Sequence, residues 1–143
     1  MMLDKWSMRL AKSGLWLFLF GLALGAAIPY FPSPRLALAA HTAAVQSGVA
    51  LIAFGLLWPH GRLAPRASML LSNALWLSTY TVVSGLTLAA VFGATRLEPI
   101  ASGGRVGTPV QEAILTVLVI GGAVGLLAAC AGWAILWRGR APE

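Results

Sequence analysis

Residues 36–58 read LALAAHTAAVQSGVALIAFGLLW, and the only ionisable side chain in this stretch is one histidine. About 20 apolar residues suffice for a helix to cross the hydrocarbon core of a bilayer, so Leu36–Trp58 predicts a membrane-spanning helix. Three further stretches meet the same criterion, at Ser13–Phe31, Ala67–Phe92 and Val110–Trp137. Membrane strands would instead alternate apolar and polar residues over about ten positions. No such alternation occurs in this sequence.

The composition of the whole chain agrees with a membrane protein. Of its 143 residues, 59% are hydrophobic and only 10% are charged, whereas a soluble domain carries about 25% charged residues. A soluble fold of this size could not bury most of this apolar surface. The net charge of +6 comes from basic residues scattered singly at the ends of apolar runs. This pattern does not match a nucleic-acid-binding surface, and we expect no nucleic-acid partner.

The connections between the four spans predict how the helices are arranged. They cover Pro32–Arg35, Pro59–Arg66 and Gly93–Pro109, and the first two contain Pro or Gly residues that end helices. Helices joined by such short loops lie antiparallel to their neighbours. We therefore predict an all-α fold, with residues 1–143 forming a single transmembrane domain. Its architecture is an integral membrane four-helix bundle of up-down topology.

Basic residues predict the orientation of the spans, because Lys and Arg accumulate in cytoplasmic segments. One side of the predicted topology has seven of them: Lys5, Arg9, Lys12, Arg62, Arg66, Arg138 and Arg140. The other side has Arg35, Arg96 and Arg105. We therefore expect a multi-pass protein of the inner membrane with both termini in the cytoplasm. Five tryptophans are expected to form an aromatic belt at the cytoplasmic interface: Trp6, Trp16, Trp58, Trp133 and Trp137. Trp76 alone lies well inside a span.

Polar side chains at bilayer depth are costly and usually face protein or a cavity. The predicted topology places a set of them at similar depth in the outer half of the bundle, where we expect them to converge on one pocket. The set comprises His41, Thr42, Gln46, Ser47, Ser84, Thr87 and Glu112. For Glu112 a structural role is favoured, because Thr108-Pro109-Val110-Gln111 forms a capping box and an acidic residue suits the first turn of a helix.

His41 is the only histidine within a span. An imidazole can ligate a metal or haem iron, or shuttle a proton, near neutral pH. The alternative is a structural histidine that hydrogen-bonds to a neighbouring helix, with Glu112 or Thr87 as its partner. No cluster of His, Cys or carboxylate residues accompanies His41 to complete a tetrahedral zinc site. A single histidine fits haem better than a bare metal ion, because the porphyrin supplies four ligands.

Rows of small residues predict close contacts between helices in lipid. The rows are Gly21 and Gly25; Ala40, Ala44 and Gly48; and Gly121, Gly125 and Ala129. Packing within one chain is the simpler explanation for most of them. Four helices cannot use every such face internally, so we also expect a homo-oligomer.

Two sequence motifs are more specific than these general features. One runs from Ser33-Pro34-Arg35-Leu36 through His41 to Ser47-Gly48, and the other combines Glu98-Pro99-Ile100-Ala101 with Gly107-Thr108-Pro109-Val110-Gln111-Glu112-Ala113. Together they resemble the hydroxylaminobenzene mutase family, which is similar to the styrene oxide isomerases, and the resemblance covers nearly the whole chain. It implies isomerisation of a small aromatic substrate, from epoxide to aldehyde or from N-arylhydroxylamine to aminophenol. It also implies haem b bound through His41 between the subunits of a homotrimer, with ferric iron as a Lewis acid.

The chain departs from this family where the substrate is expected to bind. An asparagine is expected six residues after the histidine, where this chain has Ser47 next to Gln46. In the third span, Tyr80-Thr81-Val82 replaces an aromatic-Ala-Asn triplet, and Leu86 stands where a catalytic tyrosine is expected. The resemblance thus assigns the haem ligand to His41, and the candidates for contacting the substrate are Gln46, Ser47 and Tyr80.

Two other functions are compatible with these residues. A haem-binding membrane subunit for electron transfer or sensing would need a second axial ligand, which the sequence does not obviously supply. A non-catalytic small membrane protein would use His41 only structurally. The favoured interpretation is an isomerase or mutase in which iron polarises a C–O or N–O bond and the lipid-embedded bundle excludes water.

Overall fold

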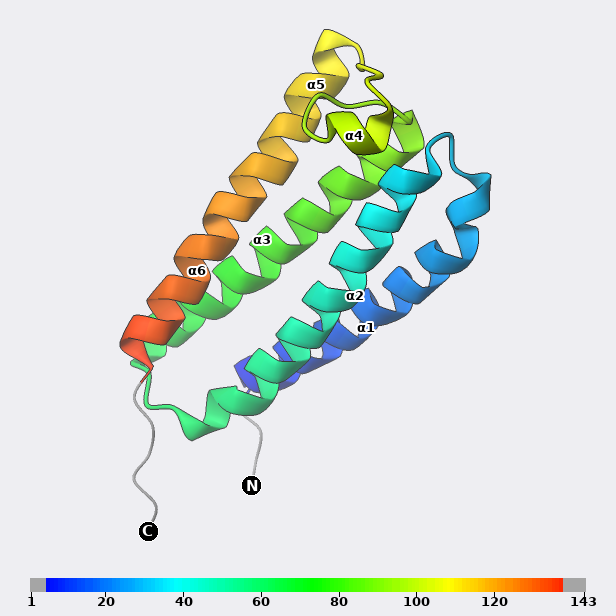
Figure 1. The fold of residues 1–143 in the computed structure, drawn as a ribbon. Helices are drawn as coiled ribbons and strands as arrows, with labels where there is room; N and C mark the ends of the chain where they lie inside the picture. Colours follow the sequence, from blue (N-terminus) through cyan, green and yellow to red (C-terminus); the bar gives the residue numbers. More distant parts are fainter. Residues whose placement is uncertain (1–4, 138–143) are drawn as a thin grey trace.

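The computed structural model describes residues 5–137, and the regular elements in that range are helices (Figure 1). The four long ones are α1 (Lys5–Ala27), α2 (Pro34–Leu57), α3 (Pro65–Phe92) and a composite of α5 (Pro109–Thr116), the π-helical turn η3 (Val117–Gly121) and α6 (Gly122–Leu136). By length and composition, each could cross a membrane. The prediction of an all-α fold with four such helices is confirmed.

Proline and glycine set the ends of these helices, as the sequence predicts. Pro34, Pro65 and Pro109 each begin a helix, where the missing backbone N–H costs nothing. Gly93 ends α3 with φ 68°, a left-handed conformation that glycine adopts without strain. The predicted capping box at Thr108 is confirmed: its side chain accepts a hydrogen bond from the Gln111 backbone, and the Gln111 side chain accepts one from the Thr108 backbone.

Several elements differ from the prediction. Helix α1 begins at Lys5 rather than Ser13 because Lys and Arg are good helix formers and lie on its exposed side. It ends at Ala27, and Pro29 follows within a 3₁₀ turn, η1 (Ile28–Tyr30). A second 3₁₀ turn, η2 (Trp58–His60), follows α2. The segment predicted as a plain connection contains a short helix, α4 (Pro99–Ser102). The π-helical turn inside the fourth long helix was also not predicted.

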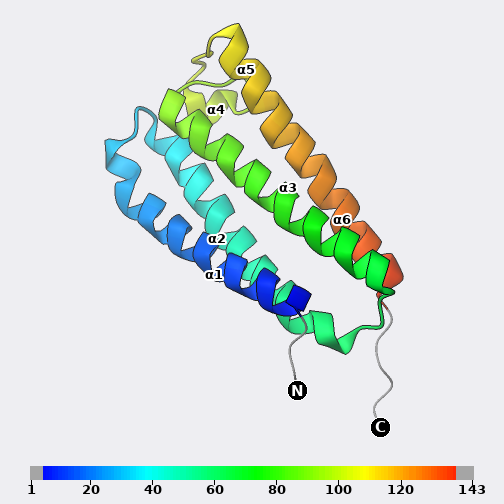
Figure 2. The same ribbon diagram turned by 180° about the vertical axis from the view of Figure 1, so that it is seen from behind.

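The four long helices run up and down, which confirms the predicted topology (Figures 1 and 2). Helix α1 packs along α2, α3 packs against both of them, and α6 packs along α3. Within residues 5–137, the α6 backbone does not neighbour that of α1 or α2. Helix α3 is therefore the central element of an open bundle. The end of the bundle with α4 lies opposite the end where α1 begins and α6 finishes.

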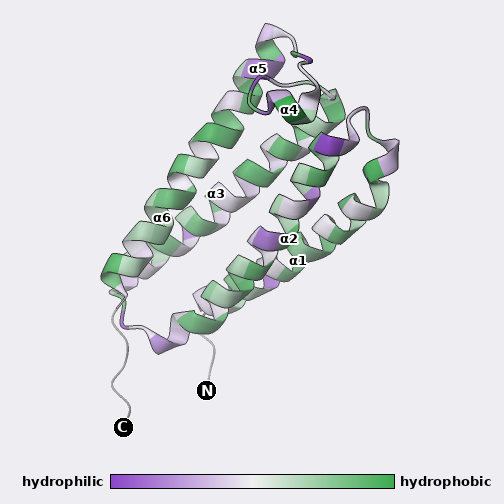
Figure 3. Cartoon of the chain, viewed as in Figure 1, coloured by the Kyte–Doolittle hydropathy of each residue, from purple (hydrophilic) through white to green (hydrophobic). Residues whose placement is uncertain are grey.

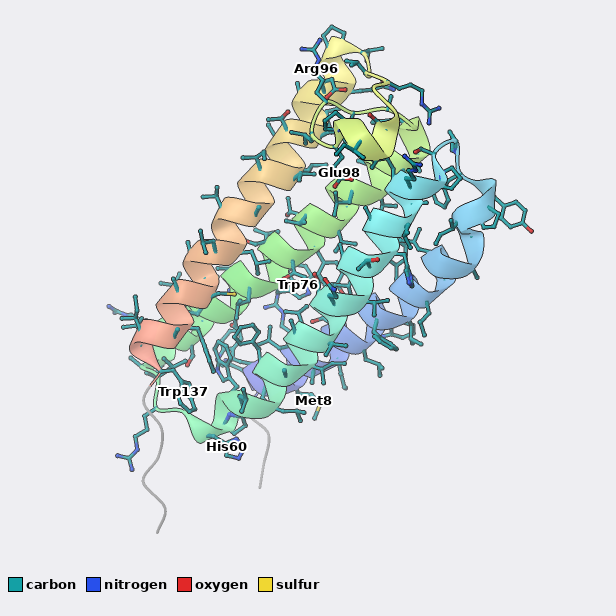
Figure 4. All side chains as sticks on the ribbon, in the orientation of Figure 1. Met8, His60, Trp76, Arg96, Glu98 and Trp137 are labelled. Carbon is teal, nitrogen blue, oxygen red and sulfur yellow. The ribbon has the colours of Figure 1, made fainter. Side chains whose placement is uncertain are left out.

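An aromatic cluster fills the end of the bundle near η2, where Trp137 and His60 lie (Figure 4). The Trp133 ring of α6 meets Phe54 of α2 edge-on at 5.0 Å, Trp58 at 6.4 Å and Trp137 at 5.3 Å. The indole nitrogens of Trp58, Trp133 and Trp137 are buried without a hydrogen-bond partner. These three residues therefore lie together at one end of the bundle and pack their indole N–H groups inward; their position at a membrane interface stays a prediction.

Apolar residues predominate along the four long helices, with a few hydrophilic positions among them, as on α2 (Figure 3). Large apolar side chains are exposed on every long helix, among them Leu15, Leu38, Leu70 and Leu127. Soluble monomers rarely expose so much apolar surface.

Candidate functional site

His41 lies near the start of α2, against a notch formed by two glycines of α1. Its Nδ1 atom lies 2.7 Å from the carbonyl oxygen of Gly21. A Cβ built on Gly25 would lie 2.8 Å from both Cε1 and Nδ1 of the imidazole. Because a carbonyl oxygen only accepts hydrogen bonds, Nδ1 is the donor. In the neutral ring, this leaves the lone pair on Nε2, where it can bind a metal ion or accept a proton.

The imidazole lies on the outward side of the α1–α2 pair. Phe54, which faces α6 through its contact with Trp133, is 13 residues beyond His41 on α2. At about 100° per residue, the two side chains leave the helix roughly 140° apart. The imidazole is half-buried, and Nε2 has no hydrogen-bond partner within residues 5–137. A group bound to Nε2 would therefore lie outside the four helices of this chain.

The structure does not bring the other predicted site residues to His41 within one chain. Gln46 is exposed and Ser47 is half-buried, and they leave α2 about 140° and 120° away from His41. The Tyr80 hydroxyl donates a hydrogen bond to the Ser13 carbonyl at 2.8 Å. Ser13 precedes the Gly21 contact of His41 by eight residues, which is about 12 Å along α1.

Thr87 and Glu112, the two residues predicted as partners of His41, are engaged elsewhere, as is its neighbour Thr42, so the predicted hydrogen bond between His41 and either of the two is wrong for the single chain. Thr42 and Thr87 each donate to the carbonyl four residues earlier, at 2.9 and 2.7 Å. The Glu112 carboxylate accepts hydrogen bonds from the backbone of Arg96 at 3.0 and 3.2 Å and of Gly107 at 2.7 Å. The structural role predicted for Glu112 is confirmed: it ties the segment after α3 to the start of α5.

The two sequence motifs meet at the end of the bundle where α4 lies. The Ser33 hydroxyl donates to the Ala101 carbonyl at 3.0 Å, which joins the start of α2 to α4. Beside this contact, a cavity of about 530 Å³ is lined by Arg35 and Glu98 among others, and Figure 4 shows Glu98 at this end. Burial raises the pKa of the Glu98 carboxyl above its usual value. Residues of the second motif therefore shape the loops at this end.

A series of contacts between α1 and α3 was not predicted. The Arg9 guanidinium donates to Asn73 Oδ1 at 2.6 Å and lies 4.8 Å from the centre of the Trp76 ring. The Trp76 ring lies 5.2 Å from that of Tyr80, and Tyr80 donates to Ser13. The one signal in the sequence was the unusual position of Trp76 deep in a span. The partners themselves are more than 60 residues apart, so no local pattern connects them.

The surroundings of His41 limit which kind of metal centre this side chain could join. Among the described residues, no group of three or more His, Cys, Asp or Glu side chains could hold a metal ion together. A bare ion such as zinc takes three or four protein ligands. Porphyrin-bound iron needs only one or two, and a histidine whose other ring nitrogen donates to a carbonyl is well oriented for this role.

Comparison with known proteins identifies the family. The profile of the family described as styrene oxide isomerase matches residues 6–138. The chain belongs to the styrene oxide isomerase family. Hydroxylaminobenzene mutase HabB of Ectopseudomonas oleovorans is 36% identical over 124 residues, covering 86% of this chain and 76% of the relative. Hydroxylaminobenzene mutase HabA of the same organism is 39% identical over 111 residues, covering 77% and 82%.

This styrene oxide isomerase family member is therefore an enzyme of the intramolecular isomerase and mutase class, and the resemblance inferred from its two motifs is confirmed. A purely structural or electron-transfer role is set aside. No solved structure matches the chain.

Proposed function

We propose that the chain is a membrane-embedded, haem-dependent isomerase or mutase that rearranges a small aromatic arylhydroxylamine or epoxide. The observation that carries this proposal is the hydrogen bond from His41 Nδ1 to the Gly21 carbonyl. Histidines that bind metals usually donate their other ring N–H to a carbonyl or carboxylate, which fixes the ring and its tautomer. The names of the two mutases similar to this chain favour an arylhydroxylamine as the first substrate to test.

The surroundings of His41 suit haem b. Leu38 and Val45 lie three and four residues from His41, which places them on the same side of α2. Leu38 is exposed and Val45 is half-buried, so the side of α2 that bears His41 also offers apolar surface. His41 is the proposed axial ligand, and the Gly21 carbonyl holds its ring in place. Ferric haem would supply a Lewis acid that polarises the C–O or N–O bond of the substrate.

Gln46 and Ser47 are the proposed hydrogen-bond donors to the substrate oxygen, and they point away from His41 of the same chain. We infer that the site is completed between subunits, where His41 of one subunit faces Gln46 and Ser47 of the next. Tyr80 is the third proposed contact. Its hydroxyl is held by the Ser13 carbonyl, so it would have to exchange that hydrogen bond to donate to a substrate. The surrounding apolar helices would exclude water from the reacting molecule.

A homotrimer is the assembly we propose. Some of the small residues expected at subunit contacts are used within the chain. A Cβ on Gly48 would meet the Phe18 backbone of α1, and one on Gly125 would meet the Ser78 side chain of α3. A Cβ on Gly121 would meet no atom within 4 Å, so this face remains available to a second subunit or to lipid.

We propose that the protein spans the inner membrane with both termini in the cytoplasm. Lys5, Lys12 and Arg62 belong to the end of the bundle near η2, and Arg35 and Arg96 to the opposite end. Arg138 and Arg140, which contributed to the prediction, lie outside the described residues. A C-terminal reporter that is active only in the periplasm is expected to give no signal. A strong signal would overturn this orientation.

The haem assignment can be tested with the protein purified from membranes. We expect a Soret band in the wild type, and its loss in His41→Ala while the variant still inserts. Thr42→Val is the matched control, because Thr42 is the next residue but bonds only to its own helix. A His41→Ala protein with full haem and an unchanged spectrum would refute the ligand.

The reaction can be tested on the same material. We expect ferric, haem-replete protein to convert hydroxylaminobenzene or styrene oxide without added nicotinamide, flavin or metal salt. Reduction to ferrous iron should slow the reaction, because it weakens the Lewis acid. No turnover of either compound above the His41→Ala control would refute the haem-dependent mechanism.

Mixed assemblies test whether the site is completed between subunits. His41→Ala chains and chains carrying both Gln46→Ala and Ser47→Ala are each expected to be impaired. Loss of a charge-assisted hydrogen bond costs about 1.5–3 kcal/mol, or roughly ten- to a hundredfold in rate. Oligomers isolated through a different tag on each chain should regain activity, because some interfaces then pair an intact His41 with intact Gln46 and Ser47. Mixed oligomers as inactive as the parents would place the complete site within one chain.

A further inference from the structure

Helices α1 and α3 enclose a cavity of about 310 Å³ that is separate from His41. It is lined by Trp16, Leu17, Phe20, Tyr80, Val83 and Ser84. Trp16 is 71% exposed and Phe20 is 43% exposed, so the cavity opens to the outside of the helix pair. Its volume lies at the lower end of the range for small-molecule sites, about 300–1,000 Å³. One aromatic ring with a small substituent fits this space.

Two polar groups border the cavity, and only one of them is satisfied. The Tyr80 hydroxyl donates to the Ser13 carbonyl, and its ring is held against Trp76. Ser84 differs from its threonine neighbours on α3. Thr81 and Thr87 each donate to the carbonyl four residues earlier at 2.7 Å, whereas the Ser84 hydroxyl has no hydrogen bond within residues 5–137. Ser84 is exposed and lines the cavity, so its hydroxyl is accessible to a ligand that carries a hydrogen-bonding group.

We propose that this cavity binds a single-ring aromatic molecule that carries one hydrogen-bonding nitrogen or oxygen. The ring would pack against Trp16 and Phe20, whose faces and edges favour offset or edge-on contacts with another ring. The polar substituent would pair with the Ser84 hydroxyl. Molecules of this class dissolve in lipid, and the opening toward the outside of α1 and α3 would admit them sideways.

Within one chain the cavity lies away from His41, although Tyr80, the third proposed substrate contact, is part of its wall. Tyr80 is anchored about 12 Å along α1 from the carbonyl that holds His41. The ligand class is also that of the proposed substrate, so its role as a reservoir for the enzyme rests on the proposed function. The cavity and the Ser84 hydroxyl, which lacks a partner among the described residues, are observed independently of the proposed function.

Binding of 4-fluoroaniline to the purified full-length protein, followed by fluorine NMR, tests the proposal. This probe has no N–O bond or epoxide, so it cannot be rearranged. We expect saturable binding by the wild type and by His41→Ala. Ser84→Ala should raise the Kd about 2- to 13-fold, the effect of one neutral hydrogen bond. Thr87→Val is the matched control: it removes a hydroxyl one turn away that already has a partner, and should leave the Kd unchanged.

Ser84→Phe should abolish binding, because the phenyl ring would occupy the cavity. Ser84 is exposed, so the larger side chain should not prevent the protein from folding. Trp16→Ala is a second variant that removes one wall at an exposed position, and it should weaken binding. Absence of saturable binding, or binding unchanged in both Ser84→Phe and Trp16→Ala, would overturn the proposal. Binding lost in His41→Ala would place the ligand at the haem site, with the same consequence. Binding at Ser84 by a protein without haem or isomerase activity would refute only the proposed function.

Discussion

Replacement of Gly25 by alanine is expected to loosen haem binding by displacing His41. The new Cβ would lie 2.8 Å from the imidazole, whereas ordinary contacts begin near 3.4 Å, so the ring must retreat by about 0.6 Å. A movement of this size lengthens or bends the 2.7 Å hydrogen bond between Nδ1 and the Gly21 carbonyl, and this bond weakens steeply with poor geometry.

The expected effect follows from the role of that hydrogen bond. Loss of a group that orients a metal-binding histidine typically lowers metal affinity about 10- to 100-fold. We therefore expect the Kd for haem, measured by titrating haem into apoprotein and following the Soret band, to rise about 10- to 100-fold. Alanine favours a helix over glycine by about 1 kcal/mol, so a loss of helix propensity cannot explain the change.

Two other glycine-to-alanine variants serve as controls. Gly121→Ala meets no atom within 4 Å and should keep the wild-type haem affinity. Gly14→Ala would place its Cβ 2.6 Å from the Gly48 carbonyl oxygen, so it disturbs the α1–α2 contact without touching His41. Wild-type haem affinity in Gly25→Ala would refute the idea that the space at Gly25 positions the His41 imidazole for haem binding. An equal loss in Gly14→Ala would show that general packing of α1 on α2, and not the imidazole position, controls haem binding.

Three further predictions concern the rest of the fold. Burial raises the pKa of the Glu98 carboxyl in the folded state above its usual 4.5. Between the unfolded-state pKa and the higher folded-state pKa, the folded state binds more protons, so stability falls as the pH rises. Glu98→Gln should therefore have a higher Tm than wild type near pH 7 and the same Tm near pH 4, and equal Tm values at both pH values would contradict this prediction. Glu112→Gln removes the charge and one acceptor oxygen that the Arg96 and Gly107 backbone groups use; faster amide exchange across residues 94–108 is expected, and unchanged exchange would count against an anchoring role. In Gly125→Leu the side chain would overlap Ser78 of α3, which should lower the Tm through loss of α3–α6 packing; a wild-type Tm would mean that Gly125 does not face α3.

The sequence alone determined the features that depend on neighbouring residues. Four apolar stretches gave four long helices, and proline and glycine set where these begin and end. The Thr108 capping box and the structural role of Glu112 were also predictable, because both involve residues close to one helix start. His41 stood out as the single histidine in a span.

Only the tertiary structure decided which way the side chains on these helices face. Hydropathy alone gives little periodic signal for the side that meets a neighbour. The rows of small residues, such as Ala40, Ala44 and Gly48, do mark a contact face, but they do not say which helix that face meets. The rotation and offset of one helix against another come from close packing of small and large side chains far apart in the chain. That packing seats His41 against Gly21 on the outward side of α1 and α2. It also bonds Tyr80 to Ser13 and places the Tyr80 side chain in the wall of a cavity between α1 and α3. It separated residues that the sequence had suggested would meet in one pocket.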